Sequence, residues 1–153
     1  MAAPELEIVP LTVAAHTTIA ADVHRYWVGG RTPPMHVLFV HEFGDLSVVA
    51  LAGDQIAGFL YGLRSTTEPA GYVHLVGVHE EYRRRGIARR LYAAFAERAA
   101  ATGASQLKAI VRPDNAPSIA FHTALGMTAT AIDDYTGPGE TRLVFRGPID
   151  DVR

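Results

Sequence analysis

Five arginines gather around one glycine and form the densest group of chemically capable residues in the sequence. They are Arg83, Arg84, Arg85, Arg89 and Arg90, with Gly86 and Ala88 between them. An apolar, β-branched run, Leu75–Val78, precedes the group, and apolar residues at helical spacing follow it. The first N–H groups of a helix have no partner within it, and small residues let the oxygens of a ligand approach them. The sequence therefore predicts a site for a diphosphate at the start of this helix.

Two further groups of polar residues have spacings that place them on common faces. Tyr72 and His74 are two residues apart, so in a strand their side chains lie on one side. Asn115, Ser118 and His122 are three and four residues apart, so in a helix they follow one stripe. Histidine suits acid–base chemistry near neutral pH, but a lone histidine is as often bonded within a core, and asparagine is a good helix cap. Chemical and structural interpretations therefore both stay open here.

The histidines do not show the spacing of a metal site. His36 and His41 are five residues apart, which does not place them on one face of a helix. No second histidine follows His41-Glu42 at the spacing of zinc proteases. We therefore predict no metal site.

The elements that must position these residues follow from periodicity and turn signals. The centre is predicted as a strand over Tyr72–Val78, the arginine-rich loop, a helix that ends at Gly103, a strand over Leu107–Val111 and a helix over Ala116–Ala124. The flanking strands are predicted over Leu6–Leu11, Leu46–Ala52, Gln55–Arg64, Met127–Ile132 and Thr141–Phe145, and the flanking helices over Val13–Trp27 and Pro34–Phe43. This order predicts an α/β fold, with one mixed sheet and helices on its faces, in a single domain over residues 1–153.

The composition is that of a globular domain without special attraction for polyanions. Of the 153 residues, 48% are hydrophobic and 20% charged, and the net charge is −2. No apolar run is long enough to span a bilayer, and the first residues carry acids rather than the basic stretch of a signal peptide. There is no cysteine, which excludes disulfides and cysteine nucleophiles. We therefore predict a cytoplasmic domain with no nucleic-acid and no membrane partner.

The spacing of Val78 from Arg83-x-x-Gly86-x-Ala88 resembles the acetyl-CoA loop of the GNAT superfamily of N-acetyltransferases. A second segment, from Asn115 to Met127, is similar to that family's N-x-x-A-x-x-hydrophobic-Tyr-x-x-L-G-F motif. The resemblance covers about residues 72–130, and upstream only the pattern of elements agrees. It implies the GNAT fold: a mostly antiparallel sheet with splayed central strands and helices on both faces. It also implies transfer of an acetyl group from acetyl-CoA to a primary amine, by direct attack in a ternary complex.

The resemblance further implies which residues bind the two substrates. The expected contacts of acetyl-CoA are Val76, Val78, Arg83, Arg84, Arg85, Gly86, Ile87, Ala88, Arg89, Asn115 and Ser118. The N–H group of Val76 or Val78 would stabilise the oxyanion, beside a bulge that Gly77 marks; packing under a helix is the other interpretation of this glycine. A small-molecule or peptide amine would bind near Trp27, Phe43 and Tyr135, where acidic side chains could hold its ammonium. A homodimer is plausible on the same basis.

The catalytic residues implied are His74, His122 and Tyr72. His74 would take a proton from the amine, directly or through water, while Tyr72 would orient a water or simply pack. His122 stands where the family has a tyrosine that protonates the departing thiolate. An imidazolium could supply that proton, or His122 only binds and the thiolate leaves unassisted. This departure keeps an alternative function open: an acyl-CoA-binding sensor or regulatory module without efficient transfer.

Overall fold

The computed structural model describes residues 5–27 and 36–153. The strands are β1 (Leu6–Pro10), β2 (Val48–Ala52), β3 (Gln55–Arg64), β4 (Ala70–Val78), β5 (Gln106–Val111), β6 (Thr128–Ile132) and β7 (Arg142–Pro148). The helices are α1 (Val13–Ala21), α2 (Val37–Phe43), α3 (Ile87–Ala100) and α4 (Ala116–Ala124), with short 3₁₀ turns at Val23–Arg25, Gly44–Leu46, Glu80–Tyr82 and Ile149–Asp151. The order of strands and helices expected from the sequence is confirmed.

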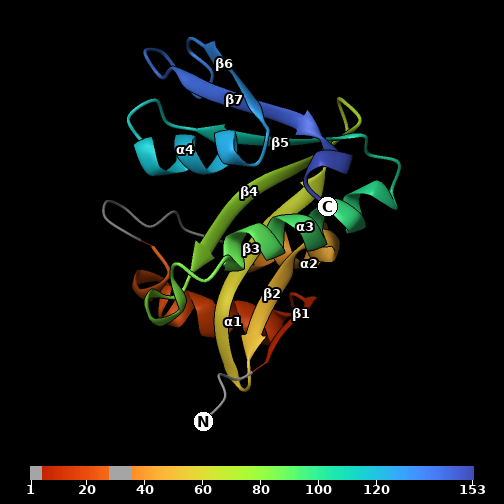
Figure 1. The fold of residues 1–153 in the computed structure, drawn as a ribbon, viewed down its shortest axis with the longest axis vertical. Coiled ribbons are helices and arrows are strands. Elements are labelled where there is room, and N and C mark those ends of the chain that lie inside the picture. Colours follow the sequence, from red (N-terminus) through yellow and green to blue (C-terminus); the bar gives the residue numbers. More distant parts are fainter. Residues whose placement is uncertain (1–4, 28–35) are drawn as a thin grey trace.

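All the strands belong to one mixed sheet with the order β1-β2-β3-β4-β5-β7-β6 (Figure 1). Only β4 and β5 run parallel, and every other neighbouring pair is antiparallel. The parallel pair is short, because residues 70–73 of β4 pair with residues 106–109 of β5. Beyond that point the two strands diverge (Figure 1), and in the described part of the chain residues 75–78 pair only with β3. The predicted splay of the central strands is confirmed.

The two faces of the sheet carry separate cores. On one face α3 and α4 cover a large cluster that includes Leu91, Phe95 and Phe145. On the other face α1 and α2 pack on a smaller cluster around Phe59 and Tyr61. The helices are therefore divided between the two faces, as expected from the sequence.

A β-bulge interrupts β4 at His74. Tyr61 lies opposite Leu75 and Gly62 lies opposite Val73, so His74 is the extra residue. The bulge lies three residues before Gly77, whose own role is packing: a Cβ at Gly77 would lie 2.7 Å from Cζ of Phe59. The packing interpretation of this glycine therefore fits the structure, and the bulge lies at His74 instead.

Two predicted helices differ in their bounds from those observed. α1 ends at Ala21 rather than Trp27, because a 3₁₀ turn follows it and directs Tyr26 into the core. The Tyr26 hydroxyl donates to the Ile56 carbonyl at 3.0 Å, a contact that local periodicity does not encode. α2 begins at Val37, capped by the Nδ1 atom of His36, and the predicted start at Pro34 lies outside the described residues.

Candidate active site

The start of α3 is built as an open anion site. Gly86 precedes the helix with a φ of 73°, a left-handed conformation that a side chain disfavours, and Arg84 has a φ of 63°. Within residues 5–27 and 36–153 no side chain caps the helix, so the N–H groups of Ile87, Ala88 and Arg89 begin it uncapped. No atom of the described part of the chain lies within 4 Å of where a Cβ would stand on Gly86. Oxygens of a ligand can therefore reach these N–H groups.

The five arginines of this loop do different work. Arg83 braces it, because Nε donates to the Val78 carbonyl and a terminal nitrogen donates to the Arg25 carbonyl, both at 3.2 Å. Arg90 donates to the Leu6 carbonyl at 3.0 Å. Arg84 and Arg85 are exposed beside the helix start, and the Arg85 guanidinium lies 5.3 Å from the centre of the Tyr82 ring. The sequence groups all five as one cation cluster, whereas three of them donate to backbone carbonyls: Arg83, Arg90 and Arg89, the last to Ala124 at 3.4 Å.

The gap between β4 and β5 leaves backbone groups of β4 accessible from that side. The His79 N–H donates to the Ala57 carbonyl at 2.8 Å and so points toward β3. N–H groups of alternate residues in a strand point to opposite sides, so those of Val78 and Val76 point toward the gap. This is the direction that an oxyanion at the gap requires, and the role predicted for these N–H groups stays a prediction.

Tyr72 and His74 lie together on the face of the sheet that carries α1 and α2. The Tyr72 hydroxyl lies 3.1 Å from Nδ1 of His74, and the His74 ring stacks on Phe39 at 5.9 Å between centroids. Burial raises the pKa of Tyr72, with a smaller contribution from Tyr135, so its hydroxyl keeps its proton. His74 has an exposed edge, yet the surrounding protein removes enough water to lower its pKa. At neutral pH the pair is thus a neutral imidazole bonded to a protonated phenol.

His122 is a buried residue whose two ring nitrogens both have partners. Nδ1 lies 2.7 Å from the Ser118 carbonyl, which only accepts, so Nδ1 carries the proton. Nε2 then accepts from the Tyr92 hydroxyl at 2.6 Å. Burial lowers the pKa of His122 and raises that of Tyr92. This geometry favours a structural role over proton donation to a thiolate, and the catalytic role stays a prediction that substitution tests.

The first turn of α4 holds the other two residues that the sequence assigns to the cofactor. Oδ1 of Asn115 accepts from the Ser118 N–H at 3.2 Å, which is the ordinary geometry of a helix cap. The Ser118 hydroxyl lies 3.3 Å from Nδ1 of His122. The structure therefore explains both residues without a ligand, and their contact with a cofactor stays a prediction.

A pocket of about 320 Å³ opens beside Tyr72, at the start of the gap between β4 and β5. Its lining residues are Leu63, Ser65, Thr66, Tyr72, Lys108, Ile110 and Tyr135. Of the three acceptor residues predicted from the sequence, Tyr135 lines this pocket, whereas Phe43 packs near Phe39, and neither Phe43 nor Trp27 is among its described lining residues. The nearby acids are engaged in the loop itself, since Asp133 accepts from Thr141 and Asp134 from the Gly139 N–H. The suggested role of these acids in holding an ammonium therefore has no support from their contacts.

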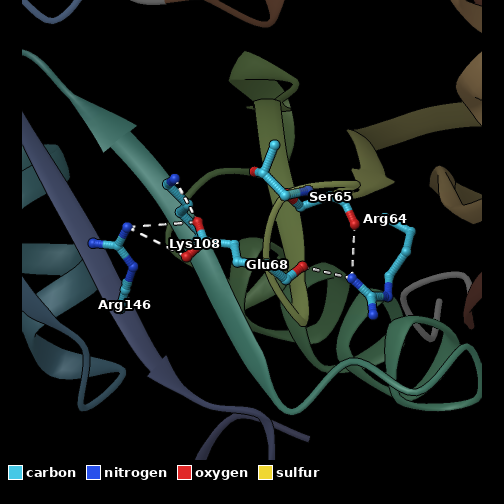
Figure 2. Close-up of polar contacts among 6 residues, drawn as sticks. Arg64, Ser65, Glu68, Lys108 and Arg146 are labelled. Atoms are coloured by element: carbon cyan, nitrogen blue, oxygen red, sulfur yellow. Dashed lines mark hydrogen bonds and ion pairs between the residues drawn. The ribbon is translucent and has the colours of Figure 1, made fainter.

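Lys108 and the loop between β3 and β4 belong to the pocket, although no sequence pattern predicted them. Figure 2 shows the side chains of Lys108 and Arg146 converging on the Glu68 carboxylate, at 2.5 Å and 3.4 Å. The Arg64 guanidinium donates to the carbonyls of Ser65 and Glu68, both at 2.7 Å, and so fixes the loop backbone (Figure 2). One feature of the sequence could have drawn attention to Lys108: it is the single lysine of the chain.

The described residues contain neither a candidate metal site nor a candidate membrane span. Within residues 5–27 and 36–153, no group of three or more His, Asp or Glu side chains is placed to hold a metal ion. Over the same ranges, no helix combines the length and the apolar character needed to cross a bilayer.

Comparisons with known proteins agree with this arrangement. The sequence profile described as the acetyltransferase (GNAT) family matches residues 16–127. The L-2,4-diaminobutyric acid acetyltransferase of Methylotuvimicrobium alcaliphilum is 26% identical over 132 residues, which are 80% of this chain and 76% of that protein.

Two solved structures share the fold. The ribosomal-protein-S18-alanine N-acetyltransferase of Escherichia coli superimposes with a TM-score of 0.75 at 20% identity, covering 95% of this chain and 94% of the other. The diaminobutyrate acetyltransferase of Paenibacillus lautus, solved with its substrate and coenzyme A, gives a TM-score of 0.70 at 20% identity, covering 95% and 96%.

Proposed function

Because the chain belongs to the GNAT family of acetyltransferases, we propose that it binds acetyl-CoA along the gap between β4 and β5 and acetylates an amine held in the pocket beside Tyr72. Membership of this family makes the chain an acyltransferase with acetyl-CoA as co-substrate. The observation that carries the proposal is a continuous line of features: the uncapped start of α3, the open side of β4, and the Tyr72–His74 pair at the pocket.

On the cofactor side, the diphosphate binds the N–H groups at the start of α3. Ile87, Ala88 and Arg89 supply these N–H groups, and the exposed cations Arg84 and Arg85 are close enough in sequence to meet phosphate oxygens. Arg83 contributes indirectly, by holding the loop against Val78. The thioester then lies in the gap, where the Val76 or Val78 N–H donates to its carbonyl oxygen.

On the acceptor side, Tyr72 lines the pocket and His74 lies behind it. An amine with an ordinary pKa enters protonated and must lose a proton before it attacks. We assign the proton transfer to this pair: the ammonium gives a proton to the Tyr72 oxygen as the Tyr72 proton passes to Nδ1 of His74. The amine nitrogen then bonds to the thioester carbon, the C–S bond breaks, and coenzyme A leaves as a thiolate. The second proton of the nitrogen, which becomes acidic as the amide forms, passes to that sulfur directly or through water.

The alternative, an acyl-CoA-binding module without efficient transfer, also has an observation in its favour. His122 stands at the position of the family's leaving-group acid, and both of its nitrogens are already bonded. A chain that binds acetyl-CoA and releases coenzyme A no faster with an amine would fit this alternative.

The test is release of free thiol from acetyl-CoA over a panel of amines, run with His74→Ala and with His24→Ala as a matched exposed histidine outside the site. We expect amine-dependent release, a loss of about a hundredfold or more in kcat for His74→Ala, and unchanged kcat for His24→Ala. Calorimetric binding of acetyl-CoA should be equal in all three proteins. Tight binding without amine-dependent release would support the sensor module.

The names of similar proteins support two candidate classes of acceptor, a diamino acid and the α-amine of a protein. Each presents a primary amine, as the mechanism needs. A cytoplasmic location and a homodimer also stay predictions, which fractionation of cells and sedimentation of the purified chain would test.

A further inference from the structure

Among the described residues, the acceptor pocket presents one charged group, and that group is a cation. Lys108 is the only ionised side chain among its lining residues, and it is joined by the hydroxyls of Ser65, Thr66, Tyr72 and Tyr135. No carboxylate lines the pocket in the described structure. A pocket for a polyamine would need the opposite charge, because each further ammonium requires a negative partner when it is desolvated.

Lys108 is held in place by residues that face the same side of the sheet. Tyr72, Lys108 and Arg146 lie directly opposite one another on β4, β5 and β7. The Lys108 side chain is 15% exposed, and its ammonium bonds to Glu68, which also meets Arg146 (Figure 2). One carboxylate thus balances two cations, and the cluster keeps one positive charge.

The loop that supplies Glu68 is itself fixed. Arg64 binds two of its carbonyls, and the same loop places Ser65 and Thr66 in the pocket wall. The acids on the neighbouring β6–β7 loop are bonded within that loop. The Lys108 side chain therefore lines the pocket in a defined position, and its ammonium and the Arg146 guanidinium share one carboxylate.

We propose that the acceptor is an amine that also carries a carboxylate, and that Lys108 binds this carboxylate while Glu68 and Arg146 position Lys108. This inference rests on the proposed function, since it names the substrate class of the same site. The carboxylate of the substrate competes with Glu68 for the ammonium and is assisted by the second cation, Arg146. The amine of the same molecule then lies toward Tyr72, one strand away from Lys108.

The experiment compares kcat/KM for matched amines: lysine and diaminobutyrate, their carboxamides, and the diamines left when their carboxylates are removed. We expect the wild-type chain to prefer each amino acid by about tenfold to a hundredfold, the range of a charge-assisted hydrogen bond. Lys108→Met should bring this ratio toward one, and Lys108→Arg should keep part of it. Arg153→Met, which removes a cation from a surface ion pair outside the pocket, should keep the wild-type ratio.

Equal kcat/KM values for the amino acids, carboxamides and diamines, or higher values for the diamines, would overturn the proposal. This comparison can be made with the wild-type chain alone. Calorimetry with coenzyme A present separates it from the proposed function. If no amine is acetylated, the transfer reaction is rejected, and binding of the same amines decides the inference. Tighter binding of the amino acids, lost in Lys108→Met, would still support it; equal binding would overturn it.

Discussion

The cofactor half and the acceptor half of the site use different parts of the chain. The cofactor half consists mainly of backbone: the N–H groups at the start of α3 and along the open side of β4. The acceptor half consists of side chains from β3, β4, β5 and two loops, which meet only in the folded chain. Backbone donors suit a ligand that never changes, whereas side chains can be exchanged without altering the fold. This difference explains why the cofactor site, but not the acceptor site, can be predicted from one short stretch of sequence.

The largest effect should come from adding a side chain at the start of α3, where the cofactor half of the site consists of backbone N–H groups. Gly86→Val should raise the Kd for acetyl-CoA by about a hundredfold, because a β-branched residue is strained at a φ of 73° and covers the helix start. Gly53→Val is the matched control, since Gly53 has a φ of 62° in an open turn away from the site. Both variants should lose stability, measured by urea unfolding. If calorimetry gives the same Kd for acetyl-CoA in both variants, the backbone at the start of α3 does not bind the cofactor.

Next in size is the effect of removing His122, which we place in the core rather than in either half. His122→Ala should lower the free energy of unfolding by about 2–4 kcal/mol, because it leaves a cavity and a buried Tyr92 hydroxyl without a partner. Tyr92→Phe should cost less, since it removes a single hydrogen bond. Equilibrium urea unfolding measures both. If His122→Ala instead keeps the stability of the wild type but has a kcat as low as that of His74→Ala, His122 is a catalytic residue.

The loss of activity at low pH, the acid limb of the pH profile, tests the role of His74 in the acceptor half of the site. His74 accepts a proton only when neutral, and burial lowers its pKa below the ordinary 6.5. Activity should therefore be complete at neutral pH and be lost as the pH falls through that lowered pKa, about tenfold per further unit. Stopped-flow measurement of kcat/KM against pH shows this limb. The residual activity of His74→Ala should lack it, and a limb that persists there would belong to another group.

The smallest effect concerns the loop that closes the acceptor pocket. Hydrogen bonding from Lys108 is the main cause that lowers the pKa of Glu68 from 4.5, so ionised Glu68 stabilises the folded chain. That stabilisation is complete above pH 4.5 and is lost as the pH falls through the lowered value. Glu68→Gln should cost about 1 kcal/mol at pH 7 and nothing in strong acid. Asp150→Asn, in an exposed ion pair, should change little at either pH.

The sequence predicted the fold well wherever the signals were local. β3 over Gln55–Arg64 and α4 over Ala116–Ala124 match the prediction because a Gly-Asp turn and an asparagine cap define their ends. Within the site, the bulge at His74 was not predictable, since it arises from the register between β3 and β4. The partner of His122 on α3 and the pocket around Lys108 depend on contacts between distant segments, which no spacing rule encodes.

The scarcity of lysine has a consequence for a protein that handles a reactive thioester. Its cationic side chains are arginines apart from Lys108, and a guanidinium keeps its proton at any physiological pH, so it does not attack acetyl-CoA. Lys108 itself is held as an ammonium against Glu68 and is no nucleophile while that contact lasts. Apart from histidine, the protein thus offers its own co-substrate almost no side-chain nitrogen to acetylate, and is chemically resistant to the reaction that it performs.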